Sequence, residues 1–348
     1  MSALLEVENL RVRFRTAGPM RARLAGIADP FLDAVLDVSF RVRAGTTFGL
    51  VGESGSGKST LGRAILGLVP VHSGTIRFDG ATPAGTSDAA FAGFRRHIAL
   101  MFQDPVASLS PRLTVKSLIT EPFVIHGLGE RDRDAEARRL LDMVNLPASF
   151  AGRYPHELSG GQARRIGVAR ALALTPKLII ADEPTAGLDV SVQGEILNLM
   201  ARLQRDLGLT YLVITHNLAV VRHISDEMAI MYMGRFVEHG PTAAIFARPA
   251  HPYTHGLFAA QPRPDPDRRR EQVELQGEVP SLAHRPSGCE FHTRCPWAQA
   301  RCRDETPRPR DVAPGHALRC HFPLPAPSPH PSAAGREREG PAASAAGG

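Results

Sequence analysis

The residues Gly52–Ser59 read GESGSGKS, a pattern of closely spaced glycines followed by a lysine and a serine. Glycines allow successive backbone N–H groups to wrap around phosphate oxygens, and the N-terminus of a following helix attracts the same negative charge. At these positions Lys58 would reach the β- and γ-phosphates of a nucleotide, and the Ser59 hydroxyl would bind Mg²⁺. The pattern predicts a triphosphate site of consecutive residues: Gly52, Glu53, Ser54, Gly55, Ser56, Gly57, Lys58, Ser59 and Thr60.

The segment Leu178–Thr185, LIIADEPT, looks like an apolar strand that ends in two adjacent carboxylates. At the carboxyl end of a strand, Asp182 can hold Mg²⁺ through its water shell, which leaves Glu183 to polarise an attacking water molecule. Taken alone, such an acidic pair could equally be a solvated turn. Because it follows a phosphate loop, we predict a nucleotide-hydrolysing site with Lys58 and Glu183 as catalytic residues.

The sequence LSGGQ at 158–162 is one that phosphate-loop proteins generally do not need. Serine and glycine donors at the start of a helix make physical sense as an anion clamp. Together with the two preceding motifs, LSGGQ makes the chain resemble the ATP-binding cassette (ABC) ATPases. The resemblance implies that Ser159, Gly160, Gly161 and Gln162 bind the γ-phosphate of an ATP molecule held by the opposite subunit.

Further positions match the same family one by one. Gln103, in MFQDP, resembles the Q-loop glutamine, which senses Mg²⁺ and contacts the transmembrane partner. His216, in VITH, resembles the switch histidine that contacts the γ-phosphate, and Asp189, in AGLD, resembles the D-loop aspartate at the dimer seam. Phe14 stands where the family places the aromatic ring that stacks on adenine, although the following insertion also offers Phe31. The resemblance thus adds Gln103 and His216 to the catalytic residues, and Gln103 to the Mg²⁺ ligands.

Longer stretches narrow the resemblance to the ATPases of oligopeptide/dipeptide importers and their nickel-importing relatives. These stretches are FQDPVASLSPRLTV, RYPHELSGGQARRIGVARAL and DEPTAGLDVSVQ, and HPYT at 251–254 resembles the start of that family's C-terminal extension. The similarity covers residues 4–320. It implies that ATP hydrolysis energises the uptake of oligopeptides or dipeptides, with nickel or another small solute as the alternative.

All four cysteines lie in one stretch near the C-terminus, with the spacing C-x5-C-x6-C-x17-C. In a reducing cytosol disulfides are disfavoured, whereas four thiolates can close a metal site. The spacing matches neither a paired zinc ribbon nor a common ferredoxin run. Some relatives in the importer family carry a 4Fe-4S cluster here, so the resemblance implies an iron–sulfur site; Zn²⁺ and unligated thiols are the alternatives. The candidate ligands are Cys289, Cys295, Cys302 and Cys320, with His292 and His316 as substitutes in the zinc case.

The elements that must position these residues alternate between strands and helices. Strand-like alternation occurs at 4–14 and 34–42, and an apolar strand at 46–51 leads into the phosphate loop, which helix-like residues 61–69 follow. Helical stripes at 132–144 and 192–203 alternate with apolar strands at 178–181, 211–215 and 228–233. This order predicts an α/β fold with a largely parallel sheet. The resemblance specifies a P-loop NTPase cassette with a RecA-like core, an antiparallel β subdomain and a helical signature subdomain.

Composition changes along the chain suggest three parts. Residues 1–247 are expected to form the nucleotide-binding domain, and residues 248–320 a small irregular extension that carries the four cysteines. Residues 321–348 are rich in Pro, Ala, Ser and Gly and cannot bury enough apolar surface to offset the entropy of ordering, so we expect them to be disordered.

From bulk properties we expect a chain that stays in the cytosol. The net charge of +6 over 348 residues is too small to indicate a nucleic-acid or membrane ligand. No apolar run reaches the roughly 18 residues of a membrane span, and the start of the chain does not read as a secretory signal. With the importer resemblance, we expect a peripheral protein on the cytoplasmic face of the membrane.

The resemblance also implies partners and a cycle. Two ATPase subunits, identical or different, would meet head to tail and trap ATP, together with two permease subunits and an extracytoplasmic substrate-binding protein; no nucleic acid is expected. The main rival is a soluble ABC ATPase acting on ribosomes or DNA, but such proteins generally have two cassettes or a long coiled coil, and this chain has neither. A regulator that switches without pumping is disfavoured by Glu183 and His216.

Overall fold

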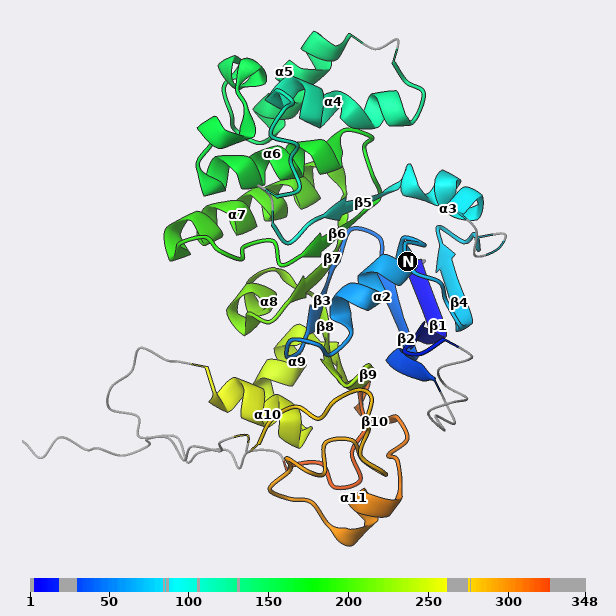
Figure 1. Ribbon diagram of the computed structural model, residues 1–348. Helices are drawn as coiled ribbons and strands as arrows, with labels where there is room; N and C mark the ends of the chain where they lie inside the picture. The colour runs from blue at the N-terminus through cyan, green and yellow to red at the C-terminus, as the bar shows by residue number, and fades with distance from the viewer. Residues whose placement is uncertain are drawn as a thin grey trace, which may run out of the picture.

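The core of the molecule is a mixed sheet at the centre of Figure 1. The computed structural model describes residues 3–18, 30–83, 85, 88–104, 107–129, 132–261, 275 and 277–325. Within these residues the sheet has eight strands, in the spatial order β10 (Arg310–Ala313), β11 (His316–Leu318), β9 (Arg235–Pro241), β8 (Glu227–Tyr232), β3 (Thr47–Val51), β7 (Thr210–Thr215), β6 (Leu178–Asp182) and β5 (Ile98–Met101). The neighbouring strands from β8 to β5 pair in parallel. β9 pairs antiparallel with β8, and β11 pairs antiparallel with β9.

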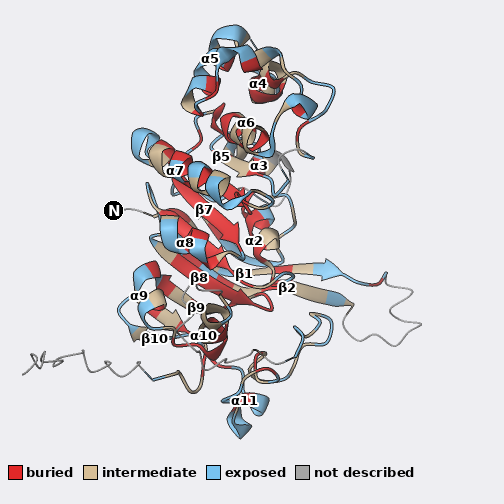
Figure 2. Cartoon of the chain, turned by 90° about the vertical axis from the view of Figure 1, so that its left-hand side faces the viewer, coloured by how far each residue is buried: buried red, intermediate tan, exposed pale blue. Residues whose placement is uncertain are grey.

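The parallel strands are buried on both faces, as Figure 2 shows by their red colour. Side chains alternate across a strand, and in β6 Ile179 and Ala181 join one apolar core while Leu178 and Ile180 join the other. A strand covered on both sides reads as a continuous apolar run, which explains the sequence LIIA before the acidic pair. The helices that pack against these strands include α2 (Lys58–Ile65), α7 (Val190–Leu207) and α8 (Leu218–Ile224), whereas α9 (Thr242–Ala247) packs against β9.

A second sheet lies beside the core and contains the N-terminal strands. It has the order β2 (Phe31–Arg43), β1 (Ala3–Arg15) and β4 (Ser73–Phe78), and both pairings are antiparallel. Its buried face packs with α2 and with alternate residues of the main sheet in a single apolar cluster. The long β1–β2 ribbon therefore extends from the same core that carries the phosphate loop.

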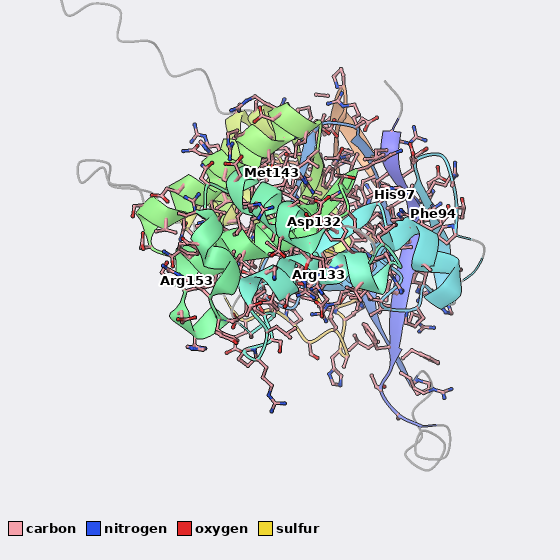
Figure 3. The ribbon with its side chains drawn as sticks, turned by 90° about the horizontal axis from the view of Figure 1, so that it is seen from above. Phe94, His97, Asp132, Arg133, Met143 and Arg153 are labelled. Carbon is pink, nitrogen blue, oxygen red and sulfur yellow. The ribbon has the colours of Figure 1, made fainter. Side chains whose placement is uncertain are left out.

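A helical layer covers the β5 end of the main sheet. It contains α4 (Val115–Ile125), α5 (Arg133–Met143), the 3₁₀ helices η1 (Ala148–Gly152) and η2 (Pro155–Glu157), and α6 (Gly160–Leu172). Figure 3 views this layer from above, where Asp132 and Met143 mark the two ends of α5. Phe94 and His97 lie to one side, at the end of α3 (Asp88–Arg95) and just before β5.

The C-terminal extension continues the main sheet. It contains α10 (Pro252–Ala259), α11 (Ala300–Asp304) and the β10–β11 hairpin, and β11 pairs with β9 at Ala317–His239 and Leu318–Glu238. Tyr253 and Phe291 are buried in one cluster with residues of β8. The segment expected to be irregular thus contributes two short strands, and its core is shared with the cassette.

The α/β fold class is confirmed, and the element bounds differ in detail. The helix expected at 61–69 begins earlier, at Lys58, because Gly57 in a left-handed conformation ends the loop there, and it stops at Ile65. The helix expected at 132–144 is α5, with the Asp132 side chain capping its N-terminus. Most of the insertion that follows Phe14 and the tail at 321–348, expected to be disordered, fall outside the described residues. No helix in the described part of the chain is long and apolar enough to span a membrane.

Candidate nucleotide-binding site

The phosphate loop connects β3 to α2 and depends on glycine at two close approaches. Gly57 has φ 103°, and a Cβ there would lie 2.2 Å from the carbonyl oxygen of Ala34. A Cβ on Gly52 would lie 2.2 Å from the carbonyl oxygen of Met231. Since real Cβ atoms do not approach backbone this closely, the loop is held between β2 and β8 by positions that only glycine can occupy.

Lys58 lies inside the loop rather than in solvent. Its Nζ donates to the carbonyl oxygens of Gly52 and Glu53, each at 2.8 Å, and to Ser56 Oγ at 3.3 Å. Burial lowers the pKa of Lys58, while the nearby charges of Glu183 and Asp182 act in the opposite direction. The ammonium group is thus held by weak neutral acceptors, which the oxygens of a bound phosphate can replace.

Ser59 and Asp182 lie together, as predicted for Mg²⁺ binding. Ser59 Oγ donates to Asp182 Oδ1 at 3.1 Å, and both residues line a cavity of about 510 Å³ with Gln103. Burial raises the pKa of Asp182, and the neighbouring Glu183 charge raises it further. The donor set consists of oxygen atoms, which is what Mg²⁺ prefers, so the residues fit the ion.

Glu183 and His216 meet at the carboxyl ends of the adjacent strands β6 and β7. The Glu183 Oε1 atom lies 2.7 Å from His216 Nδ1 and accepts the His216 backbone N–H at 3.0 Å. The other oxygen, Oε2, accepts the Thr215 hydroxyl at 2.9 Å. Thr215 was missed by the sequence analysis, although its place directly before His216 at a strand end is a usable signal. Glu183 is therefore a fixed carboxylate beside a largely exposed imidazole.

Arg164 is the second residue that the sequence analysis missed. Its guanidinium is 1% exposed and donates to the carbonyl oxygens of Phe102, Gln103 and Ala186. It stands in α6, two residues after LSGGQ. Arg164 therefore connects the signature helix with the backbone of Gln103 and with the turn after Glu183, three segments that sequence alone leaves separate.

The signature residues face solvent at the start of α6. Ser159 caps the helix by accepting the Gln162 N–H at 3.3 Å, and Gln162 Oε1 accepts the Ser159 N–H at 3.0 Å. Ser159 and Gly160 are exposed, and α6 and α2 lie apart in Figures 1 and 2. Within one chain the signature is therefore not joined to the phosphate loop, and its γ-phosphate role stays a prediction about two chains.

Asp189 and the two candidate adenine partners are also exposed. Asp189 caps α7 by accepting the Val192 N–H at 2.9 Å, and its role at a dimer seam stays a prediction. Phe14 and Phe31 are each 38% exposed, and they occupy offset positions of the β1–β2 ribbon, where Phe14 pairs with Leu32. Phe31 already lies under the guanidinium of Arg13, with the Cζ atom 4.9 Å from the ring centroid. Which of the two rings stacks on adenine stays a prediction, with Phe14 as the residue that the family resemblance favours.

The four cysteines converge on one pocket, but the predicted 4Fe-4S cluster is not supported. Cys289, Cys295, Cys302 and Cys320 all line a pocket of about 10 Å³. Among the described residues, no group of three or more His, Cys, Asp or Glu side chains is arranged to hold a metal ion. Burial raises the pKa of Cys289 to about 12 and that of Cys320 to about 11, so both thiols are neutral in this arrangement.

Of the two substitute ligands in the zinc case, only His316 is turned away from the thiols, because His292 lines the same pocket as the four cysteines. His316 Nε2 lies 2.7 Å from the buried Glu238 Oε1, and His292 Nδ1 lies 2.9 Å from the Cys289 carbonyl oxygen. The described thiols form no disulfide. The contact to the Cys289 carbonyl uses only Nδ1 of His292, so Zn²⁺ and unligated thiols both stay as alternatives.

A phosphate loop at the end of a parallel strand, a strand-end carboxylate beside a histidine, and a capped signature helix define an ABC-type nucleotide-binding cassette. The family model described as "ABC transporter" matches residues 35–186, and the model described as "Oligopeptide/dipeptide transporter, C-terminal region" matches residues 237–302. The chain belongs to the oligopeptide/dipeptide family of ABC transporter ATP-binding proteins, and the predicted family membership is confirmed.

Similar proteins cover nearly the whole chain. A probable peptide ABC transporter ATP-binding protein of Sinorhizobium fredii is 48% identical over 93% of this chain and 91% of its own length. The oligopeptide transport ATP-binding protein AppF of Bacillus subtilis is 45% identical over 92% of this chain and 97% of its own length.

Among solved structures, the dimeric ATP-binding cassette MJ0796 in a post-hydrolysis state bound to ADP and Pi is similar. It is 28% identical to this chain with a TM-score of 0.60, and the match covers 68% of this chain and 98% of that chain. The structural likeness therefore covers the cassette, and the remainder of the chain goes beyond it.

Proposed function

We propose that the chain binds and hydrolyses ATP to energise the uptake of oligopeptides or dipeptides across the cytoplasmic membrane. The observation that carries the proposal is the fixed Glu183 carboxylate at the edge of the sheet that also presents Lys58 and Ser59. The names of the relatives, which refer to peptide or oligopeptide transport, and the match of the C-terminal region support peptides as the solute. Nickel or another small solute is the alternative, and a soluble ABC ATPase is the weaker one.

The active unit would be a dimer of cassettes arranged head to tail. Ser159 caps the N-terminus of α6, and Asp189 caps the N-terminus of α7. Both residues are exposed, so a second chain can reach them. The N-terminus of a helix such as α6 attracts phosphate. The phosphate loop of the same chain, at the start of α2, lies apart from it. The partner cassette, identical or different, would supply the γ-phosphate that this signature contacts.

The chain's own residues can carry the hydrolytic step. On ATP binding, Lys58 would exchange the Gly52 and Glu53 carbonyls for phosphate oxygens and offset their charge. Mg²⁺ would be held by Ser59 and Asp182, with Gln103 nearby, and would neutralise phosphate charge. Glu183, positioned by Thr215 and by the His216 backbone, would orient the attacking water, and the His216 ring would steady the γ-phosphate.

The groove between the helical layer and β5 fits a permease segment. It has a volume of about 350 Å³ and is lined by exposed apolar side chains that include Leu68, Phe102 and Ile125. Phe102 directly precedes Gln103, so an occupant of the groove would touch the backbone that carries the Mg²⁺-sensing glutamine. Two permease subunits and an extracytoplasmic substrate-binding protein would complete the importer, with this chain bound to the cytoplasmic face of the membrane and no nucleic acid involved.

The decisive experiment compares Glu183→Gln with Glu195→Gln, an acidic residue exposed on α7. Loss of the catalytic carboxylate should lower kcat by a factor of about 10² or more, while ATP binding persists. The Glu195 variant should keep normal turnover. Full ATPase activity in Glu183→Gln would overturn the assignment, and stimulation of the reconstituted ATPase by nickel rather than by peptides would favour the alternative solute.

A further inference from the structure

The C-terminal extension reaches directly into the phosphate loop. Arg294, in the Cys-bearing segment, forms a two-pronged ion pair with Glu53, the second residue of GESGSGKS, with its two terminal nitrogens 2.8 and 3.1 Å from the carboxylate oxygens. The residues are 241 positions apart in the sequence. The Arg294 side chain is 6% exposed and that of Glu53 26% exposed, so solvent screens the pair only partly.

A second contact from the extension holds the same loop residue. The Tyr253 hydroxyl, from α10, accepts the Glu53 backbone N–H at 3.1 Å. Tyr253 packs on Tyr232 and Phe291, and the Arg294 guanidinium lies 5.9 Å from the Tyr232 ring centroid. Glu53 is therefore fixed at its backbone and at its carboxylate by the extension, while its carbonyl oxygen accepts Lys58 Nζ at 2.8 Å.

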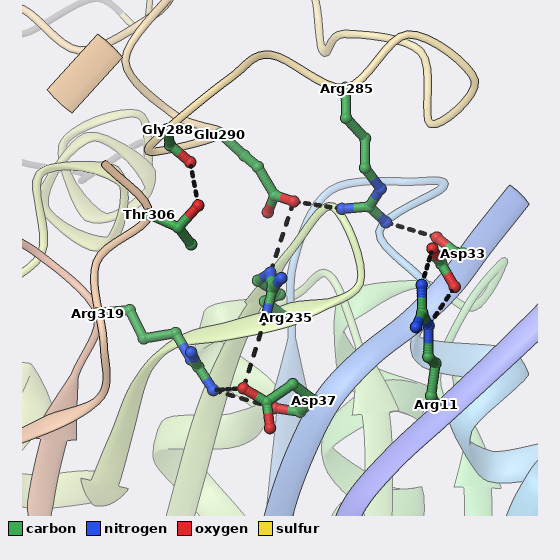
Figure 4. A network of polar contacts seen from close by, with 9 residues as sticks. All are labelled: Arg11, Asp33, Asp37, Arg235, Arg285, Gly288, Glu290, Thr306 and Arg319. Atoms are coloured by element: carbon green, nitrogen blue, oxygen red, sulfur yellow. Dashed lines mark hydrogen bonds and ion pairs between the residues drawn. The ribbon is translucent and has the colours of Figure 1, made fainter. Parts of the chain in front are cut away.

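The extension is also anchored to the strand that touches the other end of the loop. Figure 4 shows Arg319 paired with Asp37 of β2, and Arg285 placed between Glu290 and Asp33. Asp33 and Asp37 flank Ala34, whose carbonyl oxygen faces Gly57 of the phosphate loop. Arg294 therefore contacts Glu53 from a segment that is itself attached to β2, the strand that touches Gly57 of the loop.

Anchoring alone does not require a contact at position 53. The apolar cluster around Tyr253 and Phe291, the pairing of β11 with β9 and the β2 ion pairs already attach the extension to the cassette. A two-pronged arginine contact adds fixed geometry to a single carboxylate, and here that carboxylate belongs to a loop that must hold a precise shape around phosphates.

We propose that Arg294 is a positioning residue that acts through Glu53 to hold the phosphate loop in its ATP-binding shape, so that the C-terminal extension sets the affinity of the cassette for ATP. The inference rests on the proposed ATPase function. It assigns to the extension an effect on the nucleotide site, beyond any contact with transporter partners. A loop freed from Arg294 must be ordered when ATP binds, and the cost appears as weaker binding.

The test is a double-mutant cycle on the full chain, with Mg-ATP binding measured by calorimetry in the Glu183→Gln background. Because hydrolysis is blocked there, affinity is read independently of turnover. The variants are Arg294→Gln, Glu53→Gln and both together, with Arg301→Gln as the matched control, since Arg301 forms an exposed ion pair with Glu305 in the same extension. Each single change should raise the Kd for ATP about five- to tenfold, and the double variant no further.

Glu53→Gln separates positioning from plain electrostatics. Removing a negative charge near phosphates would by itself tighten ATP binding, whereas loss of positioning weakens it. If charge alone acted, the two single changes would shift Kd in opposite directions and the double variant would return close to the parent value.

One further variant and one kinetic measurement also test the positioning role of Arg294. Arg294→Lys, which keeps the charge but loses the two-pronged geometry, should give an intermediate Kd. In the otherwise unsubstituted chain the effect should appear in KM for ATP, with kcat within about twofold. If Arg294→Gln does not fold, Glu53→Gln removes the same pair from its more exposed side.

An unchanged or lower Kd in Glu53→Gln, or an equal rise in Arg301→Gln, would overturn the proposal. Absence of turnover in the parent chain would instead contradict the ATPase function.

Discussion

His216 Nδ1 lies 2.7 Å from Glu183 Oε1, and the backbone N–H of His216 donates to the same oxygen. The two residues end neighbouring parallel strands and are 33 positions apart in the sequence. Glu183 also has φ 50°, a left-handed conformation in which its backbone N–H donates to the Ile214 carbonyl. The carboxylate is therefore fixed from several sides, and each contact can be removed separately.

Replacing Thr215 by valine should slow hydrolysis without weakening ATP binding. The change keeps the side-chain shape but removes the hydroxyl that donates to Glu183 Oε2 at 2.9 Å. A carboxylate held by fewer contacts orients water less well, so we expect kcat to fall about tenfold, which corresponds to roughly 1–1.5 kcal/mol for one hydrogen bond. Steady-state ATPase kinetics measure the effect, and a rise confined to KM would contradict this role.

Replacing Gly57 by alanine should abolish ATP binding. An alanine Cβ would lie 2.2 Å from the Ala34 carbonyl oxygen, and φ 103° is strained for any L side chain. We expect a loss of about 1–3 kcal/mol in the free energy of unfolding as well as a collapsed phosphate loop. Gly194→Ala in α7 is the matched control, because a Cβ there meets nothing within 4 Å. Calorimetric titration with Mg-ATP and denaturant unfolding check both parts, and retained binding in Gly57→Ala would refute the steric argument.

Replacing Ile125 by aspartate should disrupt the permease groove. Ile125 is 69% exposed yet lines the apolar groove between the helical layer and β5, so a charge there disfavours docking at little cost in stability. Co-purification with the permeases should fall at least tenfold, while the ATPase activity of the isolated chain is kept. Leu207→Asp, at the exposed end of α7, should leave assembly intact. Equal losses in both variants would show that the groove has no special role.

Acidification should destabilise the junction between the cassette and the extension at His251. Complete burial lowers the pKa of His251 to about 4, and its Nδ1 accepts the Tyr253 backbone N–H at the start of α10. Because the folded-state pKa lies below the unfolded value, the unfolded chain binds the proton first. The contribution of neutral His251 to the free energy of unfolding is fully present above about pH 6.5. It is lost as the pH falls towards 4, and the loss amounts to at most about 3 kcal/mol.

Two other groups at this junction also have shifted pKa values, and one of them is His239, whose pKa burial lowers. Burial alone would raise the pKa of Glu238, but the hydrogen bonds from His316 and the backbone N–H groups of Ala250 and His251 outweigh burial and lower it. Its contribution is therefore present above the ordinary carboxyl pKa of 4.5 and is lost as the pH falls from there through the lowered folded pKa. His251→Asn keeps a capping acceptor and does not titrate, so its unfolding free energy should change less between pH 6.5 and 4. Parallel curves for both proteins in denaturant unfolding would rule out His251 as the cause.

Much of the nucleotide site could be predicted from local sequence. A strand, a glycine loop and a helix are neighbours along the chain, so the spacing of GESGSGKS fixes where Lys58 and Ser59 lie relative to a phosphate. The same holds for Asp182 and Glu183 at the end of an apolar strand. The bounds of α2 were less accessible, because the left-handed Gly57 starts the helix at Lys58 through its contact with Ala34 of a distant strand.

The sequence by itself determined which residues could do the chemistry and which family they belong to, because these depend on residue type and on short spacings. Only the tertiary structure decided the contacts between distant segments: Thr215 on Glu183, Arg164 under Gln103, and Arg294 on Glu53. It also decided that the four thiols share one pocket and that no group of metal-ligating side chains is arranged to hold an ion within the described part of the chain. The reason is physical, since backbone geometry is set locally, whereas burial, ion pairing and thiol pKa depend on what the fold packs against each group.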